Sequence, residues 1–188
     1  MIIPYGKYSP HIHPTAYIAE NATITGNVHI AEYVSLWYQT VIRGDVSPVY
    51  IGQSANIQDG SVLHQSPGLP VIIEEEATIG HQAMIHSATV RKGALVGMGA
   101  TMLDDSELGT SAMLGAGSLL TGGKKIPPYT LALGRPARPV RELTKEELAD
   151  MKRICNDYVQ KGQAYKKQQH ASIDLNDQLP GAKNQSLE

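Results

Sequence analysis

Three histidines are the side chains of this sequence with the clearest capacity for chemistry. They are His64, His81 and His86, and the last two lie in the stretch TIGHQAMIHSATV at positions 78–90. Neutral imidazole is a common zinc ligand, and a catalytic zinc ion usually has three protein ligands and one open position for water. The other four of the seven histidines have no evident partners, so we interpret them as ordinary surface or N-terminal residues.

The elements that carry these histidines follow from a six-residue repeat. With insertions of three and four residues and one shortened step, aliphatic residues mark eighteen positions: Ile18, Ile24, Ile30, Leu36, Ile42, Ile51, Ile57, Leu63, Ile73, Ile79, Ile85, Val90, Val96, Met102, Leu108, Leu114, Leu120 and Ile126. The residue two positions before each is Ala, Val, Ser or Thr, except for Lys124. An α-helix would repeat its apolar residues every three or four positions. A six-residue period is instead typical of a parallel β-helix, in which each repeat is a short strand and a bend.

The pattern resembles that of the left-handed parallel β-helix, a fold family that uses three repeats per coil. We therefore predict a mainly β protein in which residues 1–140 form about six coils of a triangular prism. The marked residues point into the prism, and the small residues fit near its corners. The absence of phenylalanine agrees with a narrow core of Ile, Leu, Val and Ala.

The repeat count places the histidines on the prism. His64 and His86 each directly follow a marked residue, so they point outward, and they lie three repeats, or one coil, apart. They should stack about 4.7–4.9 Å apart along the axis, with Arg43 in the same column one coil earlier. His81 lies two residues past a marked residue on the preceding face, so it points elsewhere. A three-histidine site closes if His81 comes from a neighbouring subunit, and a homotrimer would contain three such sites.

The repeat loses one residue between Ile85 and Val90, next to these histidines. Our hypothesis is that the shortened repeat tightens the bend after His86, aims its imidazole outward and brings a neighbouring subunit close. A harmless local deletion is the alternative.

A helix is predicted after the repeats, at residues 141–169, beyond the Pro- and Gly-rich segment KKIPPYTLALGRPARPV. Thr144 and Glu147 have the spacing of a capping box at its start. An apolar stripe is predicted to pack against the prism, and it consists of Leu148, Met151, Ile154, Cys155, Tyr158 and Val159. Residues 170–188 are polar, and we predict that they form a mobile tail.

Composition excludes several classes of function. Sixteen basic and eighteen acidic residues argue against a nucleic-acid partner held by bulk charge. The single cysteine, Cys155, rules out an intrachain disulfide and fits a cytoplasmic protein. The N-terminus lacks a charged start followed by an apolar run, so we expect no signal peptide. No run of 18 apolar residues is present, so we expect no membrane-spanning helix.

Five segments resemble the γ-class carbonic anhydrases and their compact bacterial relatives. These segments are RGD (43–45), NIQDGSVLH (56–64), IGHQAMIHSATV (79–90), LVGMGA (95–100) and LGRPAR (133–138), and the resemblance extends from residue 10 to about 165. It implies that His64, His81 and His86 bind a metal, with His81 supplied by the adjacent subunit of a homotrimer. It also implies zinc as the cofactor, with iron or cobalt as alternatives. The remaining site residues that it implies are Asn56 and Gln58 beside water and substrate, Arg43, Asp45 and Asp59 in an interface ion-pair set, and Tyr158 from the final helix.

The activity implied by the resemblance is the reversible hydration of carbon dioxide to bicarbonate by zinc-bound hydroxide. Gln58 would orient the hydroxide or a substrate oxygen, and Asp59 would steady a histidine or Arg43. The proton-shuttle residues depart from the family pattern. The best-known members carry a glutamate after RGD and an acidic loop after the first histidine, whereas this chain has Val46 and QSPGLP. The acidic run at 74–76 is interpreted as a solvated bend.

Two other classes of function stay open. One is an acyl-CoA thioesterase or acyltransferase, for which RPARPVREL offers basic residues to a CoA phosphate, although the segment reads equally well as a turn at the domain end. The other is a non-catalytic, metal-binding trimer. In simpler interpretations the Arg43, Asp45 and Asp59 set only holds the trimer together, Gln58 forms a ladder between coils, and Tyr158 only packs the helix on the prism.

Overall fold

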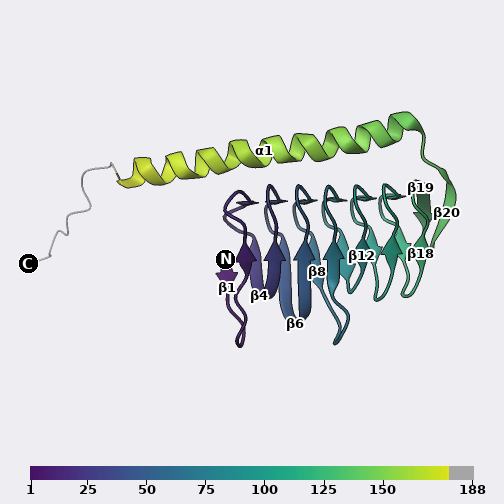
Figure 1. The fold of residues 1–188 in the computed structure, drawn as a ribbon, viewed down its shortest axis with the longest axis horizontal. Helices are drawn as coiled ribbons and strands as arrows, with labels where there is room; N and C mark the ends of the chain where they lie inside the picture. The colour runs from purple at the N-terminus through teal and green to yellow at the C-terminus, as the bar shows by residue number, and fades with distance from the viewer. Residues whose placement is uncertain (178–188) are drawn as a thin grey trace, which may run out of the picture.

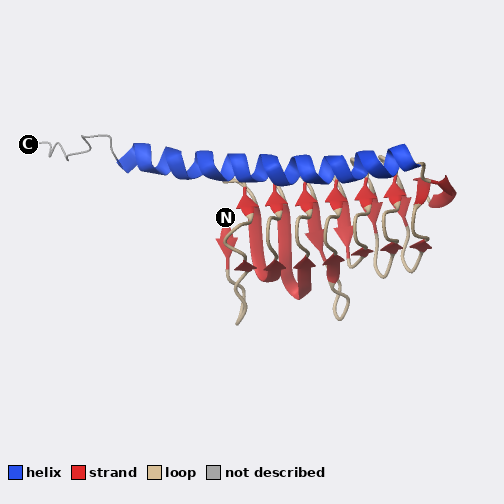
Figure 2. Cartoon of the chain, turned by 45° about the horizontal axis from the view of Figure 1, so that its top comes forward, coloured by secondary structure: helices blue, strands red, loops and turns tan. Residues whose placement is uncertain are grey.

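A prism of short strands with one long helix along it makes up the structure. The computed structural model describes the backbone of residues 1–177 and the side chains as far as Gln169. The strands wind in coils, and the helix α1 (Lys145–Asp177) lies along the length of the coils (Figures 1 and 2). The arrangement confirms the predicted parallel β-helix followed by a helix.

Each face of the prism is a stack of parallel strands. The face under α1, here the helix-covered face, contains β3 (Tyr17–Ile18), β5 (Ser35–Leu36), β7 (Asn56–Ile57), β10 (Thr78–Ile79), β13 (Leu95–Val96), β16 (Met113–Leu114) and β19 (Thr130–Gly134), with β20 (Ala137–Glu142) antiparallel at its edge. The next face, here the histidine face, contains β1 (Ile2–Ile3), the first parts of β4 (Thr23–Ile30) and β6 (Val41–Ile51), β8 (Val62–His64), β11 (Met84–His86), β14 (Thr101–Met102) and β17 (Leu119–Leu120). The third face contains β2 (His11–Ile12), the later parts of β4 and β6, β9 (Val71–Ile73), β12 (Thr89–Val90), β15 (Glu107–Leu108) and β18 (Lys125–Ile126).

Three strands extend the six predicted coils. The strands β1 and β2 precede the first marked position, and β19 follows the last. They pair in parallel with β4 and β16, so they continue the stacks on the three faces. The ends of the prism therefore lie outside the regular part of the repeat.

The core consists of the two columns that the repeat defined. Seventeen of the eighteen marked residues are at most 4% exposed, and Ile18 in the first coil is partly buried. In the column of small residues, every member is buried except Lys124, the one that broke the pattern. Stacked aliphatic side chains of this kind remove apolar surface from water in every coil, which stabilises the prism.

The helix α1 begins with the predicted capping box and packs on the prism as expected. The backbone N–H of Thr144 donates to Glu147 Oε2 at 2.8 Å, and the N–H of Glu147 donates to Thr144 Oγ1 at 3.2 Å. Met151 and Cys155 of the predicted stripe are buried. At Gly162 the helix approaches β5 closely, since an added Cβ would lie 3.0 Å from Ser35 Cβ.

The predicted end of this helix was wrong. The helix continues to Asp177, whereas its predicted end is residue 169. The chain between Gly162 and Pro180 contains neither glycine nor proline, so no strong helix breaker lies near residue 169. The rest of the predicted tail, residues 178–188, lies outside the described residues.

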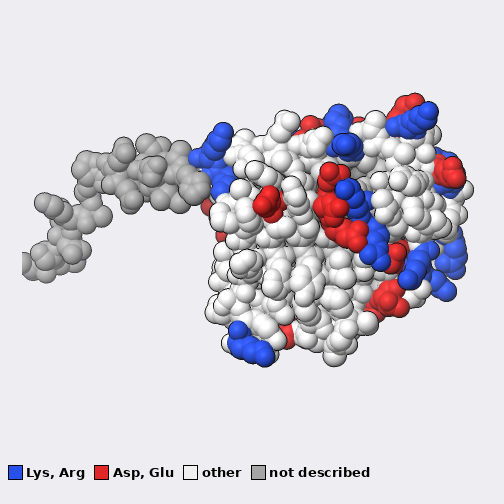
Figure 3. All heavy atoms as spheres, viewed as in Figure 1, with Lys and Arg blue, Asp and Glu red and all other residues white. Residues whose placement is uncertain are grey.

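Charged side chains of both signs share the surface. On the side shown in Figure 3 they gather in a band, and most of the remaining surface is uncharged. The acidic run at 74–76 takes part in ion pairs between coils, because Glu74 pairs with Arg91 at 2.7 Å and Glu75 with Lys92 at 3.1 Å. Within residues 1–177, no helix is both long enough and apolar enough to cross a membrane.

Candidate metal centre

His64 and His86 lie side by side on the histidine face. They are in register on β8 and β11, directly after the buried residues Leu63 and Ile85. Nδ1 of His64 lies 3.2 Å from Nε2 of His86. The structure thus brings these two histidines together as the repeat count predicted.

In each ring, the nitrogen that does not face the other histidine contacts a carboxylate. Asp45 Oδ1 lies 3.3 Å from His64 Nε2, and Asp104 Oδ1 lies 2.5 Å from His86 Nδ1. An ionised carboxylate only accepts hydrogen bonds, so the nitrogen that faces it carries the proton of the neutral ring. The other nitrogen of each ring is then bare, and the two bare nitrogens are the pair that lies 3.2 Å apart.

Three groups at this site have shifted pKa values, namely Asp45, Asp104 and His64. Burial raises the pKa of Asp45, but the hydrogen bond and charge of Arg43, at 2.5 Å, outweigh it and lower that pKa. The hydrogen bonds from Ser66 and His86 lower the pKa of Asp104. Burial and then the charge of Arg43 lower the pKa of His64, which favours the neutral imidazole that a metal requires.

The pair fits two ligands of one metal ion. Zinc–nitrogen bonds of 2.0–2.1 Å in a tetrahedral site place two ligand nitrogens roughly 3.3 Å apart, close to the distance between the bare nitrogens. Carboxylates that accept from the far side of ligating histidines are a frequent feature of metal sites. His64 and His86 therefore have the donor type, spacing and support that a divalent metal needs.

His81 lies at another corner of the prism. It follows β10 on the helix-covered face, where its Nδ1 lies 2.8 Å from Asp59 Oδ2 and its Nε2 lies 3.5 Å from the Tyr158 hydroxyl. In the part of the chain that the structure describes, no three His, Cys, Asp or Glu side chains are grouped so that they could hold a metal ion. One chain thus offers a two-histidine half-site and, separately, a single histidine.

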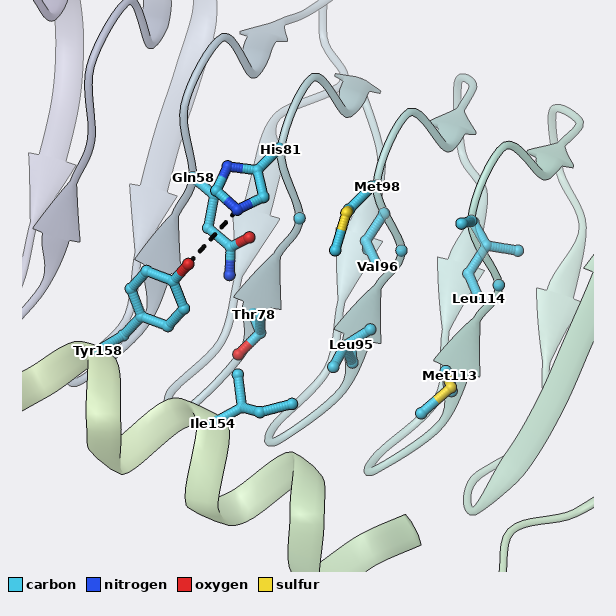
Figure 4. A pocket seen from close by; sticks show the side chains of 14 residues that line it. Gln58, Thr78, His81, Leu95, Val96, Met98, Met113, Leu114, Ile154 and Tyr158 are labelled. Atoms are coloured by element: carbon cyan, nitrogen blue, oxygen red, sulfur yellow. Dashed lines mark hydrogen bonds between the residues drawn. The ribbon is translucent and has the colours of Figure 1, made fainter.

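The predicted polar residues divide between the surroundings of His81 and those of His64. Gln58 lines the same groove as His81 and Tyr158 (Figure 4), and its Nε2 donates to Asn56 Oδ1 at 3.1 Å. Asn56 in turn donates to Thr78 Oγ1 of the next coil at 2.8 Å, so Asn56 serves as a ladder between coils. Arg43 and Asp45, by contrast, lie beside His64, and Asp59 lies beside His81.

Asp104 was not predicted from the sequence. This residue follows β14, the strand that pairs with β11 one coil beyond His86. Its carboxylate also accepts from Ser66 Oγ at 2.6 Å, so two groups fix its position. A register count from His86 to the next coil could have placed it nearby, although no motif singled it out.

Known proteins resemble this chain over almost its whole length, although no family model matches it. A carbonic anhydrase of Geobacillus kaustophilus is 56% identical over 96% of this chain and 100% of the relative. The mitochondrial gamma carbonic anhydrase 1 of Arabidopsis thaliana is 37% identical over 84% of this chain and 59% of the relative. A Bacillus cereus crystal structure described provisionally as an acetyltransferase has a TM-score of 0.88 and 54% identity, over 88% of this chain and 96% of that one.

Proposed function

Because the chain belongs to the γ-class carbonic anhydrase-like family of hexapeptide-repeat proteins, we propose that it hydrates carbon dioxide reversibly in the cytoplasm. The metal sites of the proposed enzyme lie between the subunits of a homotrimer. His64 and His86 of one subunit and His81 of a neighbour hold the metal, which we propose to be zinc, with iron or cobalt as alternatives.

One observation supports the metal more than any other. The bare nitrogens of His64 and His86 point at each other across 3.2 Å, while Asp45 and Asp104 hold the far nitrogens. Two lone pairs at this distance repel unless a cation lies between them. A metal ion bound by both nitrogens would satisfy both lone pairs, and imidazole nitrogens favour a transition metal.

The separate position of His81 supports the trimer. Its Nε2 is also the bare nitrogen, because Asp59 faces Nδ1. A zinc site with an open position needs three protein ligands, and the described residues of one chain bring only two histidines together. A threefold arrangement would supply the missing ligand at every interface from the same surface of the next subunit.

The residues around the site have distinct tasks in the proposed reaction. A bound zinc ion would act as a Lewis acid that makes hydroxide available near neutral pH. Gln58, which is 5% exposed, would orient a substrate oxygen with its amide. Asp45, Asp59 and Asp104 would fix the orientation of the three imidazoles. Tyr158, whose hydroxyl lies near His81, would donate a hydrogen bond to the product.

The test combines metal analysis with stopped-flow hydration of carbon dioxide. Wild-type protein should bind one metal per subunit, and the variants His64→Ala and His81→Ala should lose both metal and activity. His29→Ala is the matched control, because His29 lies on the third face against Tyr50 and should change neither. Full metal content without hydration in the wild type would contradict the hydratase and favour a metal-binding trimer without catalysis.

A second candidate is an acyl-CoA thioesterase or acyltransferase. It is favoured by the similar Bacillus cereus structure, which is described provisionally as an acetyltransferase. Hydrolysis of acetyl-CoA by the same metal-loaded samples separates the two candidates. Thioester cleavage that exceeds hydration and is lost in His81→Ala would replace the hydratase proposal.

A further inference from the structure

A column of glycines leaves one strip of the helix-covered face without side chains. Gly80, Gly97 and Gly115 directly follow the inward residues of β10, β13 and β16, which are neighbours in the sheet. In the two coils before them, the same place is taken by Trp37 and Gln58. At the glycines, which begin at the coil that carries His81, no side chain projects from this position, so the surface of the helix-covered face is lower there than at Trp37 and Gln58.

Gly80 and Gly97 cannot be replaced by a residue with a side chain, and at Gly115 the Leu133 side chain occupies the place of a Cβ. A Cβ at Gly97 would lie 2.5 Å from the backbone nitrogen of Ala116, and one at Gly80 would lie 2.8 Å from that of Met98. Glycine is thus needed for the coils to stack. The consequence on the outer side is a trough that crosses two coil spacings, or about 10 Å.

Side chains enclose this trough as a groove of about 410 Å³. Leu95 and Met113 of the prism and Ile154 of α1 form its apolar walls, and Met98 lies beside them (Figure 4). Its polar side chains gather at one end, where Figure 4 shows Gln58, His81 and Tyr158 together. The groove is thus apolar along most of its length and polar at the end where His81 lies.

The size of the groove does not match carbon dioxide alone. Organic ligands commonly occupy pockets of 300–1,000 Å³ that are mostly apolar, with a few polar groups that fix the orientation. A triatomic substrate needs only the polar end. The apolar length beyond it suits an unbranched chain of methylene groups, and the two methionines can adapt to such a chain.

We propose that the trough binds the aliphatic chain of an acyl compound, with its carbonyl group at Gln58, His81 and Tyr158. The Tyr158 hydroxyl and the Gln58 amide donate hydrogen bonds to the carbonyl oxygen. The chain lies over Gly97 and replaces water against Leu95, Met113 and Ile154. This inference rests on the proposed function, because the polar end of the trough is part of the proposed metal site, and binding is therefore measured separately from turnover.

The test is calorimetric titration of the metal-loaded protein with acetate, octanoate and methyl octanoate. Octanoate should bind at least tenfold more tightly than acetate, because only octanoate fills the apolar length. Methyl octanoate carries the same chain without a charge, so the comparison shows whether the trough takes a carboxylate or an ester. Equal affinities for acetate and octanoate would overturn the proposal.

Two variants locate the binding. Met113→Trp should fill the trough and abolish the preference for octanoate, whereas Val140→Trp, at an exposed position of β20, should preserve it. Circular dichroism checks that both variants fold. An octanoate preference that survives in Met113→Trp would place the chain elsewhere and overturn the proposal.

The variant His64→Ala separates this proposal from the proposed function. It lacks a metal ligand but retains the whole trough. Octanoate preference in His64→Ala would support the trough even if the wild type fails to hydrate carbon dioxide. Hydration by the wild type without any octanoate preference would refute the trough and leave the hydratase intact.

Discussion

Each of the three histidines contacts an aspartate, and the contact of His86 with Asp104 is the shortest of the three at 2.5 Å. We predict that Asp104→Asn weakens metal binding about 10- to 100-fold, because an amide no longer fixes the imidazole with a charge. Metal affinity measured by chelator competition checks this. Asp105→Asn is the matched control, since Asp105 is exposed, has a φ of 57° that asparagine tolerates, and should bind metal like the wild type.

Val46 lies next to Asp45 and is 47% exposed, so an apolar side chain stands where a carboxylate could relay a proton. We predict that Val46→Glu raises the rate of carbon dioxide hydration severalfold in dilute buffer, because a carboxylate can accept the proton that hydration releases. The gain should shrink in concentrated buffer, which accepts the proton directly. Val140→Glu adds the same charge far along the chain, and an equal gain from it would contradict the relay.

At the scale of single residues, the contacts that follow from the register of the repeat were predicted from the sequence. The contacts that depend on how far a side chain extends were not. The stacking of His64 and His86 depends only on the register of two coils, so the repeat was enough to predict it. The contact of Asp104 with His86 depends on how far a side chain extends across a bend, and no period encodes that. The proximity of Tyr158 to His81 came from resemblance, because the register of a helix on a sheet cannot be counted.

Among the elements, α1 depends on a close approach at Gly162. Glycine inside a helix usually costs about 0.5–1 kcal/mol relative to alanine, so Gly→Ala would normally stabilise. Here an added Cβ would lie 3.0 Å from Ser35 Cβ and 3.4 Å from Tyr17 Cβ. We predict that Gly162→Ala destabilises the protein by roughly 1–2 kcal/mol through overpacking.

Chemical denaturation measures this effect, with Ala149→Gly as the comparison. Ala149 is exposed on the same helix, so its variant should show only the usual helix-propensity cost of about 1 kcal/mol. A Gly162→Ala protein more stable than the wild type would show that the helix can move away from β5 without loss.

The two ends of α1 show why one boundary was predictable and the other was not. The start is encoded locally by Thr144 and Glu147, whose reciprocal hydrogen bonds are present. The end has no comparable signal, so its position was predicted from the point where the sequence becomes mostly polar. The aromatic contacts that join helix and prism, such as Trp37 with Tyr165 at 5.2 Å, bring together residues far apart in the sequence and were not foreseen.

For the molecule as a whole, the repeat encodes the fold because every coil repeats the same inward columns. The one shortened repeat also has a structural consequence. Ser87 forms its bend with a φ of 47°, and its hydroxyl accepts from the backbone N–H of Ser66 at 2.6 Å. Its carbonyl accepts from the N–H of Asp105 at 2.8 Å. The bend thus links the segments that carry His64 and Asp104, and the hypothesis that it aims His86 outward and brings a neighbouring subunit close stays a prediction.

The assembly itself gives the sharpest prediction, because the proposed site divides between two subunits. His81→Ala and His64→Ala homotrimers should each lack metal and activity. In a trimer that mixes both variants, one interface receives an intact His81 from one subunit and intact His64 and His86 from the next. Mixed trimers, co-expressed with two affinity tags and purified on both, should therefore recover about one third of the wild-type metal content and hydration rate.

Mixing of wild-type subunits that carry the same two tags provides the control for assembly. If all three histidines of a site belonged to one subunit, no mixed trimer of the two variants would contain an intact site, and both metal and activity would stay absent. Recovery near one third requires the two half-sites to face each other across every interface. The separation of His81 from His64 and His86 within one chain would then follow from the way the site is built.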